Sequence, residues 1–121
     1  MLIVRSTKYF MPPFDVIALE DRIVVQVEVA GMQLQDFNIT LNNHHLVIRG
    51  VRHRPNFDSE ATYHRVEIGF GEFRLDIPLP WTLVTDQVSA SYRDGFLSID
   101  LPRHPETQIQ VTDKGQANNN E

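Results

Sequence analysis

The chain has 121 residues, a formal net charge of −5 and a sequence pI near 5.4. Its length suits a single domain, and a hydrophobic share of 41% is enough to bury a core, so a largely unfolded body is not expected. The acidic balance argues against nucleic-acid binding, which needs a basic surface to neutralise phosphates. The absence of cysteine excludes disulfides, thiolate chemistry and cysteine-based zinc sites.

Composition divides the chain into three segments: a short apolar arm over 1–13, a body over 14–102 and a flexible polar tail over 103–121. Pro12-Pro13 and Pro102 mark the boundaries, because proline cannot donate to a strand ladder. No stretch approaches the ~20 apolar residues of a membrane span. The apolar run at the N-terminus is also shorter than the roughly 7–15 residues of a signal-peptide core, so we expect a cytoplasmic protein.

The body alternates apolar and polar residues with period two, which predicts β-strands. In chain order, the expected strands cover 14–19, 22–29, 37–42, 45–53, 62–68, 73–77, 88–92 and 96–101. One helical turn is expected over 33–36 and a loop over 54–61. Asp94-Gly95 is a strong hairpin signal, because glycine accepts a positive φ. This spacing of short strands predicts an all-β fold, an immunoglobulin-like antiparallel β-sandwich.

Several short motifs follow one another along the chain. They are Ala30-Gly31-Met32, the stretch from Leu46 to Arg52, His64–Glu67 with Gly71-Glu72-Phe73, the stretch from Ala90 to Leu97 with Leu101-Pro102-Arg103, and Ile109-Gln110-Val111. Each is weak alone, but their order and spacing resemble the small heat-shock protein (α-crystallin) family. The resemblance implies an ATP-independent chaperone, a holdase that binds partly unfolded proteins and suppresses their aggregation. It also implies dimers that assemble into oligomers.

The resemblance implies an oligomer anchor in the tail, formed by Ile109 and Val111. Residues two apart in an extended segment share a face, so the pair is able to enter one groove together. The groove expected to receive them is formed by Phe37, Ile39, Leu41, Val88 and Ala90. The alternative is that Ile109 and Val111 are two apolar residues in a frayed chain end.

The resemblance further implies that the loop swaps between protomers and pairs with strand 14–19 of a partner. The residues expected to make this contact are Pro55, Asn56, Phe57 and Asp58. Two features depart from the family pattern: Leu75 stands where an arginine is usual, with Arg74 beside it, and the arm is shorter than in most members.

The arm is too apolar for a free, solvated terminus. Its apolar residues are Leu2, Ile3, Val4, Tyr9, Phe10 and Met11. We expect them to contact clients or partners. Packing against their own domain or a sister subunit is an equally weighted alternative, and the two are not exclusive.

No residue pattern predicts an enzyme, a cofactor site or a metal site. His53 and His64 flank the loop, but a zinc site needs three or four protein ligands. No phosphate-binding loop is present, so ATP use is not expected. The competing function is a monomeric adaptor of the related co-chaperone type, which docks on one specific partner.

Overall fold

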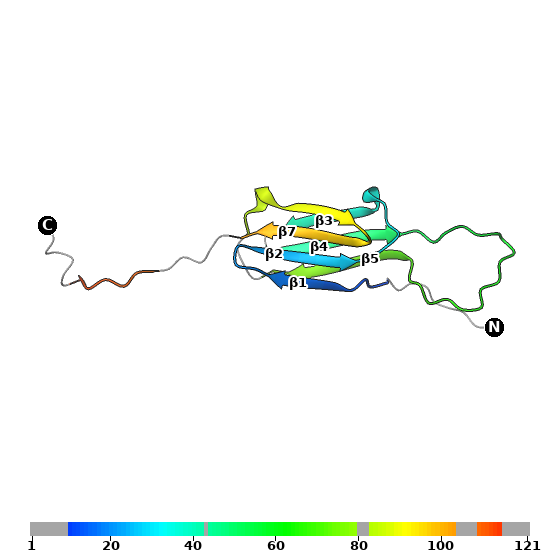
Figure 1. Cartoon of the computed structure of the whole chain (residues 1–121), viewed down its shortest axis with the longest axis horizontal. Helices are drawn as coiled ribbons and strands as arrows, with labels where there is room; N and C mark the ends of the chain where they lie inside the picture. The colour runs from blue at the N-terminus through cyan, green and yellow to red at the C-terminus, as the bar shows by residue number, and fades with distance from the viewer. Residues whose placement is uncertain (1–9, 43, 80–82, 104–108, 115–121) are drawn as a thin grey trace.

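The computed structural model describes residues 10–42, 44–79, 83–103 and 109–114. Its strands form two antiparallel sheets (Figure 1). Sheet A has the order β1-β2-β7-β6, formed by Phe14–Ala18, Arg22–Glu28, Phe96–Pro102 and Ser89–Arg93. Sheet B has the order β3-β4-β5, formed by Phe37–Asn42, His45–Arg52 and Gly71–Pro78. Two 3-10 turns, η1 (Leu34–Asp36) and η2 (Thr85–Gln87), precede β3 and β6. The predicted all-β, immunoglobulin-like sandwich is confirmed.

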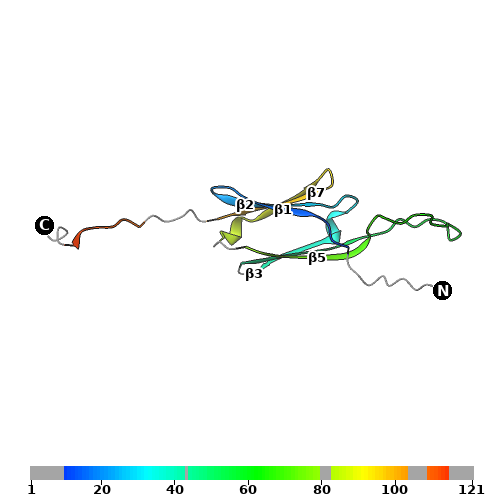
Figure 2. The same cartoon turned by 90° about the horizontal axis from the view of Figure 1, so that it is seen from below.

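The hydrophobic core lies between the two sheets, which Figure 2 views from the side. Alternate residues of each central strand point inward, as the period-two pattern predicts. The buried residues of the four strands that contribute most are Ile23, Val25, Val27, Leu46, Ile48, Phe73, Leu75, Ile77, Leu97, Ile99 and Leu101. No polar or charged side chain is buried among the described residues. Apolar burial, worth roughly 1.5–3 kcal/mol for each large side chain, therefore holds the sandwich together.

The hairpin between β6 and β7 turns at Asp94 and Gly95, whose φ angles are 54° and 84°. Arg93 pairs with Phe96 across this two-residue connection. Two consecutive positive φ values match the right-handed twist of the strands on either side. The turn therefore forms where the sequence predicts it.

The strand expected over 62–68 does not form, and this prediction was wrong for the single chain. The whole of 53–70 is an irregular segment that projects from one end of the sandwich between β4 and β5 (Figure 1). An apolar-polar alternation produces a strand only where a neighbouring strand completes the hydrogen-bond ladder. No other strand of the described chain pairs with this segment.

Candidate functional site

An apolar groove lies between β3 and β6, at the edge where the two sheets meet. Its volume is about 220 Å³, and it is lined by Leu34, Phe37, Ile39, Ala90, Ser91, Tyr92 and Leu97. Phe37, Ile39 and Ala90 were expected in the anchor-receiving groove, and they lie together here. Leu41 and Val88, the other two expected residues, do not line this groove; both are half-buried and pack against the core. The groove offers apolar side chains from both sheets to a single ligand.

Tyr92 forms part of the groove wall and is fixed by polar and aromatic contacts. Its hydroxyl donates a hydrogen bond to the Val29 carbonyl at 2.7 Å and accepts one from the Met32 amide at 3.3 Å. Its ring lies 5.1 Å from the Phe37 ring, measured between centroids. Tyr92 and Leu34 were not among the residues expected in the groove. The signal that predicts Tyr92 here is its place in the same stripe as Ala90, because residues two apart on a strand share a face.

Ile109 and Val111 are 86% and 93% exposed, so neither contacts the sandwich of its own chain. The described tail residues lie beyond one end of the sandwich, and loop 53–70 lies beyond the other (Figure 1). The groove of the same chain is therefore open while the tail pair is exposed. Their association between chains stays a prediction.

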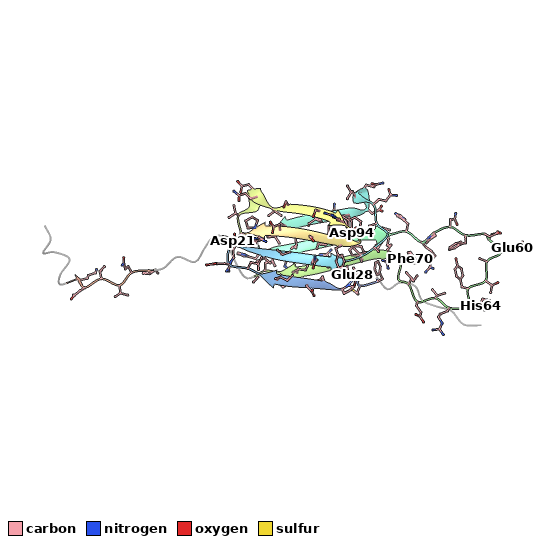
Figure 3. The ribbon with its side chains drawn as sticks, in the orientation of Figure 1. Asp21, Glu28, Glu60, His64, Phe70 and Asp94 are labelled. Carbon is pink, nitrogen blue, oxygen red and sulfur yellow. The ribbon has the colours of Figure 1, made fainter. Side chains whose placement is uncertain are left out.

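Loop 53–70 is exposed along most of its length, and Pro55, Asn56, Phe57 and Asp58 all lie on its surface. Figure 3 shows Glu60 and His64 on its outer part, far from the sheets. The loop exposes four large apolar side chains: Phe57, Tyr63, Val66 and Ile68. Exposed apolar patches commonly mark interaction sites. The loop is therefore a candidate contact surface.

Strand β1 forms an edge of sheet A, and Figure 1 shows it beyond β5, an edge strand of sheet B. Phe14 and Val16 pair with the buried residues Val27 and Val25, so they face the inner side of the sheet. They are nevertheless 38% and 45% exposed, because no described strand of sheet B lies opposite them (Figure 1). This edge presents both an unpaired backbone ladder and apolar side chains.

Among the described residues of the arm, Phe10 packs against the core. Phe10 is half-buried, and its ring meets the Phe73 ring edge-on at a centroid distance of 5.4 Å. Met11 is exposed. The other arm residues with an expected contact role, Leu2, Ile3, Val4 and Tyr9, lie outside the described residues.

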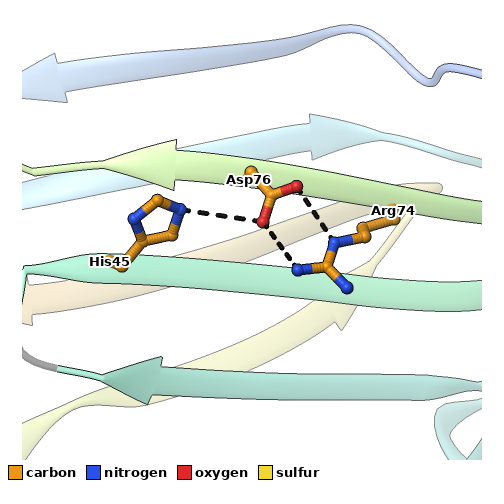
Figure 4. A network of polar contacts seen from close by, with 3 residues as sticks. All are labelled: His45, Arg74 and Asp76. Atoms are coloured by element: carbon orange, nitrogen blue, oxygen red, sulfur yellow. Dashed lines mark hydrogen bonds and ion pairs between the residues drawn. The ribbon is translucent and has the colours of Figure 1, made fainter.

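The outer face of sheet B carries a polar cluster of His45, Arg74 and Asp76 (Figure 4). His53 lies 3.4 Å from Asp36, whereas His64 lies on the outer part of loop 53–70 (Figure 3). The two histidines that flank the predicted loop 54–61 therefore do not form one site. Within the described part of the chain, no group of three or more His, Cys, Asp or Glu residues is placed to hold a metal ion. No helix there is long and apolar enough to cross a membrane.

A four-stranded and a three-stranded sheet packed around an apolar core define an immunoglobulin-like sandwich. The model of the Hsp20/alpha crystallin family matches residues 15–114, and the chain belongs to that family. It is 28% identical over 98 residues to small heat shock protein C2 of Rickettsia felis, an alignment that covers 81% of this chain and 64% of that relative.

Solved structures agree with the sequence match. Heat shock protein 16.0 of Schizosaccharomyces pombe superposes with a TM-score of 0.75 at 25% identity, covering 86% of this chain and 96% of that one. A small heat-shock protein of Xylella fastidiosa, described as having a distinct high order structure, superposes with a TM-score of 0.70 at 26% identity. That match covers 88% of this chain and all of the other.

Proposed function

We propose that this protein is an ATP-independent holdase, which binds partly unfolded proteins and keeps them from aggregating. The observation that carries the proposal is the exposure of large apolar side chains at three separate places: the β1 edge, loop 53–70 and the tail. Exposed apolar surfaces of this kind bind other apolar surfaces, and no chemical reaction is involved. Membership of a small heat-shock protein family supports the same function. The protein then acts in the cytoplasm, not as an enzyme, and needs no nucleotide, cofactor or nucleic acid.

The building block is a dimer in which loop 53–70 of one protomer pairs with β1 of the other. Two features of the described part of the chain support this arrangement: β1 has one edge with no pairing strand, and the loop exposes Phe57, Val66 and Ile68 without a strand partner. A strand that is added to an open edge gains main-chain hydrogen bonds and buries alternate side chains. Pro55, Asn56, Phe57 and Asp58 would make the first part of that contact.

Oligomers form when Ile109 and Val111 of one dimer enter the β3–β6 groove of another. Burial of two such side chains contributes about 4 kcal/mol before the cost of ordering the tail. One tail alone then binds with a dissociation constant on the order of millimolar or weaker. Several tails hold one assembly together by avidity. Each tail is still able to detach, and its groove is then available to the tail of an exchanging subunit.

The test is light scattering from a heat-unfolding client protein, with and without this protein and without ATP. We expect suppression near stoichiometric ratios. In parallel, the double substitution Ile109→Ala with Val111→Ala is expected to reduce the oligomer to dimers. Gln110→Ala, which changes the intervening residue, is the matched control and is expected to leave the oligomer unchanged.

No suppression at several-fold excess of folded protein would contradict the holdase. If the protein is then also monomeric, the adaptor that docks on one specific partner becomes the better description. An oligomer size that is unchanged by the double substitution would contradict the tail anchor only.

A further inference from the structure

Arg52, the last residue of β4, contacts three separate segments of the chain. Its Nε and Nη2 both donate hydrogen bonds to the Gly69 carbonyl, at 3.0 and 2.6 Å, and Nη1 donates to the Ala30 carbonyl at 3.1 Å. The guanidinium also lies 4.5 Å from the centroid of the Phe10 ring and 5.3 Å from that of Phe70. One side chain therefore joins the corner after β2, the arm and the C-terminal end of loop 53–70.

Phe10 fits into this junction closely. A Cβ atom added at Gly69 would lie 2.8 Å from the Cβ of Phe10, so the missing side chain of Gly69 makes room for the arm. On its other side, the Phe10 ring meets Phe73 of the core edge-on. The arm is thus attached to the sandwich at the base of the loop, between a core phenylalanine and the face of Arg52.

Arginine suits this position for a physical reason. Its planar fork donates several hydrogen bonds in one plane, while its faces stack on aromatic rings. Both properties are used here: two carbonyl groups accept hydrogen bonds from Arg52, and two phenylalanine rings lie near its guanidinium group. Lysine keeps the charge, but its ammonium group has neither the fork nor the flat face.

We propose that Arg52 is the positioning residue of the loop-swapped dimer. It holds the base of loop 53–70 in place with Phe10 docked against it, so that arm docking and dimerisation are coupled. This inference rests on the proposed function, because it assigns a role within that dimer. A loop whose base is already ordered loses less conformational freedom when its outer part pairs with a partner. Because coupling between two binding events is reciprocal, dimerisation then also strengthens the docking of the arm.

The first test is the dimer dissociation constant, measured by sedimentation on the full-length protein. We expect Arg52→Ala, Arg52→Lys and Phe10→Ala each to raise it about 5- to 100-fold. Combining Phe10→Ala with Arg52→Ala is expected to add little to either alone, because both remove the same junction. Arg49→Ala is the matched control: it removes the same charge from the exposed face of the same strand, and is expected to leave the constant within about twofold.

The second test follows the docking of the arm directly, and its readout does not require a dimer. Because the chain has no cysteine, Met11→Cys provides a single attachment point for a spin label at an exposed position next to Phe10. The label is expected to be hindered in the otherwise unchanged protein and in Arg49→Ala, and mobile in Arg52→Ala and Arg52→Lys. Thermal unfolding of each variant confirms that it is folded.

The outcomes separate the two proposals. Equal label mobility with and without Arg52 would overturn the docking role, whatever the oligomeric state. Additive effects of Phe10→Ala and Arg52→Ala on the dissociation constant would overturn the coupling. A monomeric wild-type protein whose label is freed by Arg52→Ala would refute the loop-swapped dimer, and with it the coupling, but not the docking of the arm by Arg52.

Discussion

The Arg74 guanidinium donates two parallel hydrogen bonds to the Asp76 carboxylate on the outer face of β5, at 3.0 and 3.1 Å (Figure 4). The Nε2 atom of His45 lies 3.7 Å from the same carboxylate. The hydrogen bonding from Arg74 is the main reason that the pKa of Asp76 lies below its usual 3.8. Desolvation opposes this shift, and the positive charges of Arg74, His45 and Arg49 add to it.

This cluster makes the stability of the fold depend on pH in the acidic range. A carboxyl group with a lowered pKa in the folded state stabilises that state above its unfolded pKa, and the contribution is lost as the pH falls through the folded pKa. We therefore expect the stabilisation by the Asp76 carboxylate, measured as the difference in unfolding free energy between wild type and Asp76→Asn, to be present from pH 7 down to about pH 5. Below the usual value of 3.8 it should shrink toward zero.

Urea unfolding of both proteins across this range measures the effect. Glu72→Gln, which removes one carboxylate from an exposed position on the same strand, is the control for a general loss of negative charge. A difference between wild type and Asp76→Asn that persists unchanged at the most acidic pH would contradict the prediction.

Leu75, where the resemblance to the family led us to expect an arginine, belongs to the core. It is only 2% exposed and lies on the inner face of β5 between Phe73 and Ile77. We expect Leu75→Ala to lower the unfolding free energy by about 2–5 kcal/mol, because a cavity remains. Leu75→Met, which keeps the volume, should cost less than about 1.5 kcal/mol. Chemical denaturation compares the two, and equal losses would argue against a tightly packed site.

Gly50 on β4 lies directly against Phe73 on β5, its cross-strand neighbour. A Cβ atom at Gly50 would lie 2.5 Å from the Cε2 and Cζ atoms of the Phe73 ring, which is too close for any real contact. We expect Gly50→Ala to destabilise the fold by about 1–3 kcal/mol through overpacking.

The test of this cause is a double-mutant cycle with Phe73→Leu, which shortens the opposing side chain. If the clash with the ring is responsible, Gly50→Ala should cost less in the Phe73→Leu background than in wild type. Thermal or urea unfolding of the four proteins measures both costs. Strictly additive losses would assign the effect to the backbone of β4 instead.

Much of the fold could be predicted from local patterns. The alternation of Ile23, Val25 and Val27 and the turn at Asp94-Gly95 depend on residues close together in the chain, and both appear as expected. The predicted strand over 62–68 does not form, because a local pattern alone is not sufficient for a strand. Its alternation is also local, but a strand needs a neighbour, and among residues 10–42, 44–79, 83–103 and 109–114 none pairs with it.

The groove could be predicted only in part, because periodicity tells which face a residue occupies and not which element lies across from it. Leu34 is 71% exposed on η1, and it lines the groove because the short turn before β3 brings it there. The role of Arg52 is harder still to predict. Its hydrogen-bond acceptors are backbone carbonyls of Ala30 and Gly69, and any residue has such a carbonyl.

Strands β2 and β7 are neighbours in sheet A, although they come from opposite ends of the domain. During synthesis, the ladder between β2 and β7 therefore cannot form completely until residue 102 has been added. Until then, Ile23, Val25 and Val27 lack the covering that they have in the finished sandwich, and such unfinished chains are prone to aggregate. Every nascent copy thus passes through a state that resembles the proposed clients. Finished copies are expected to protect the new ones as they leave the ribosome.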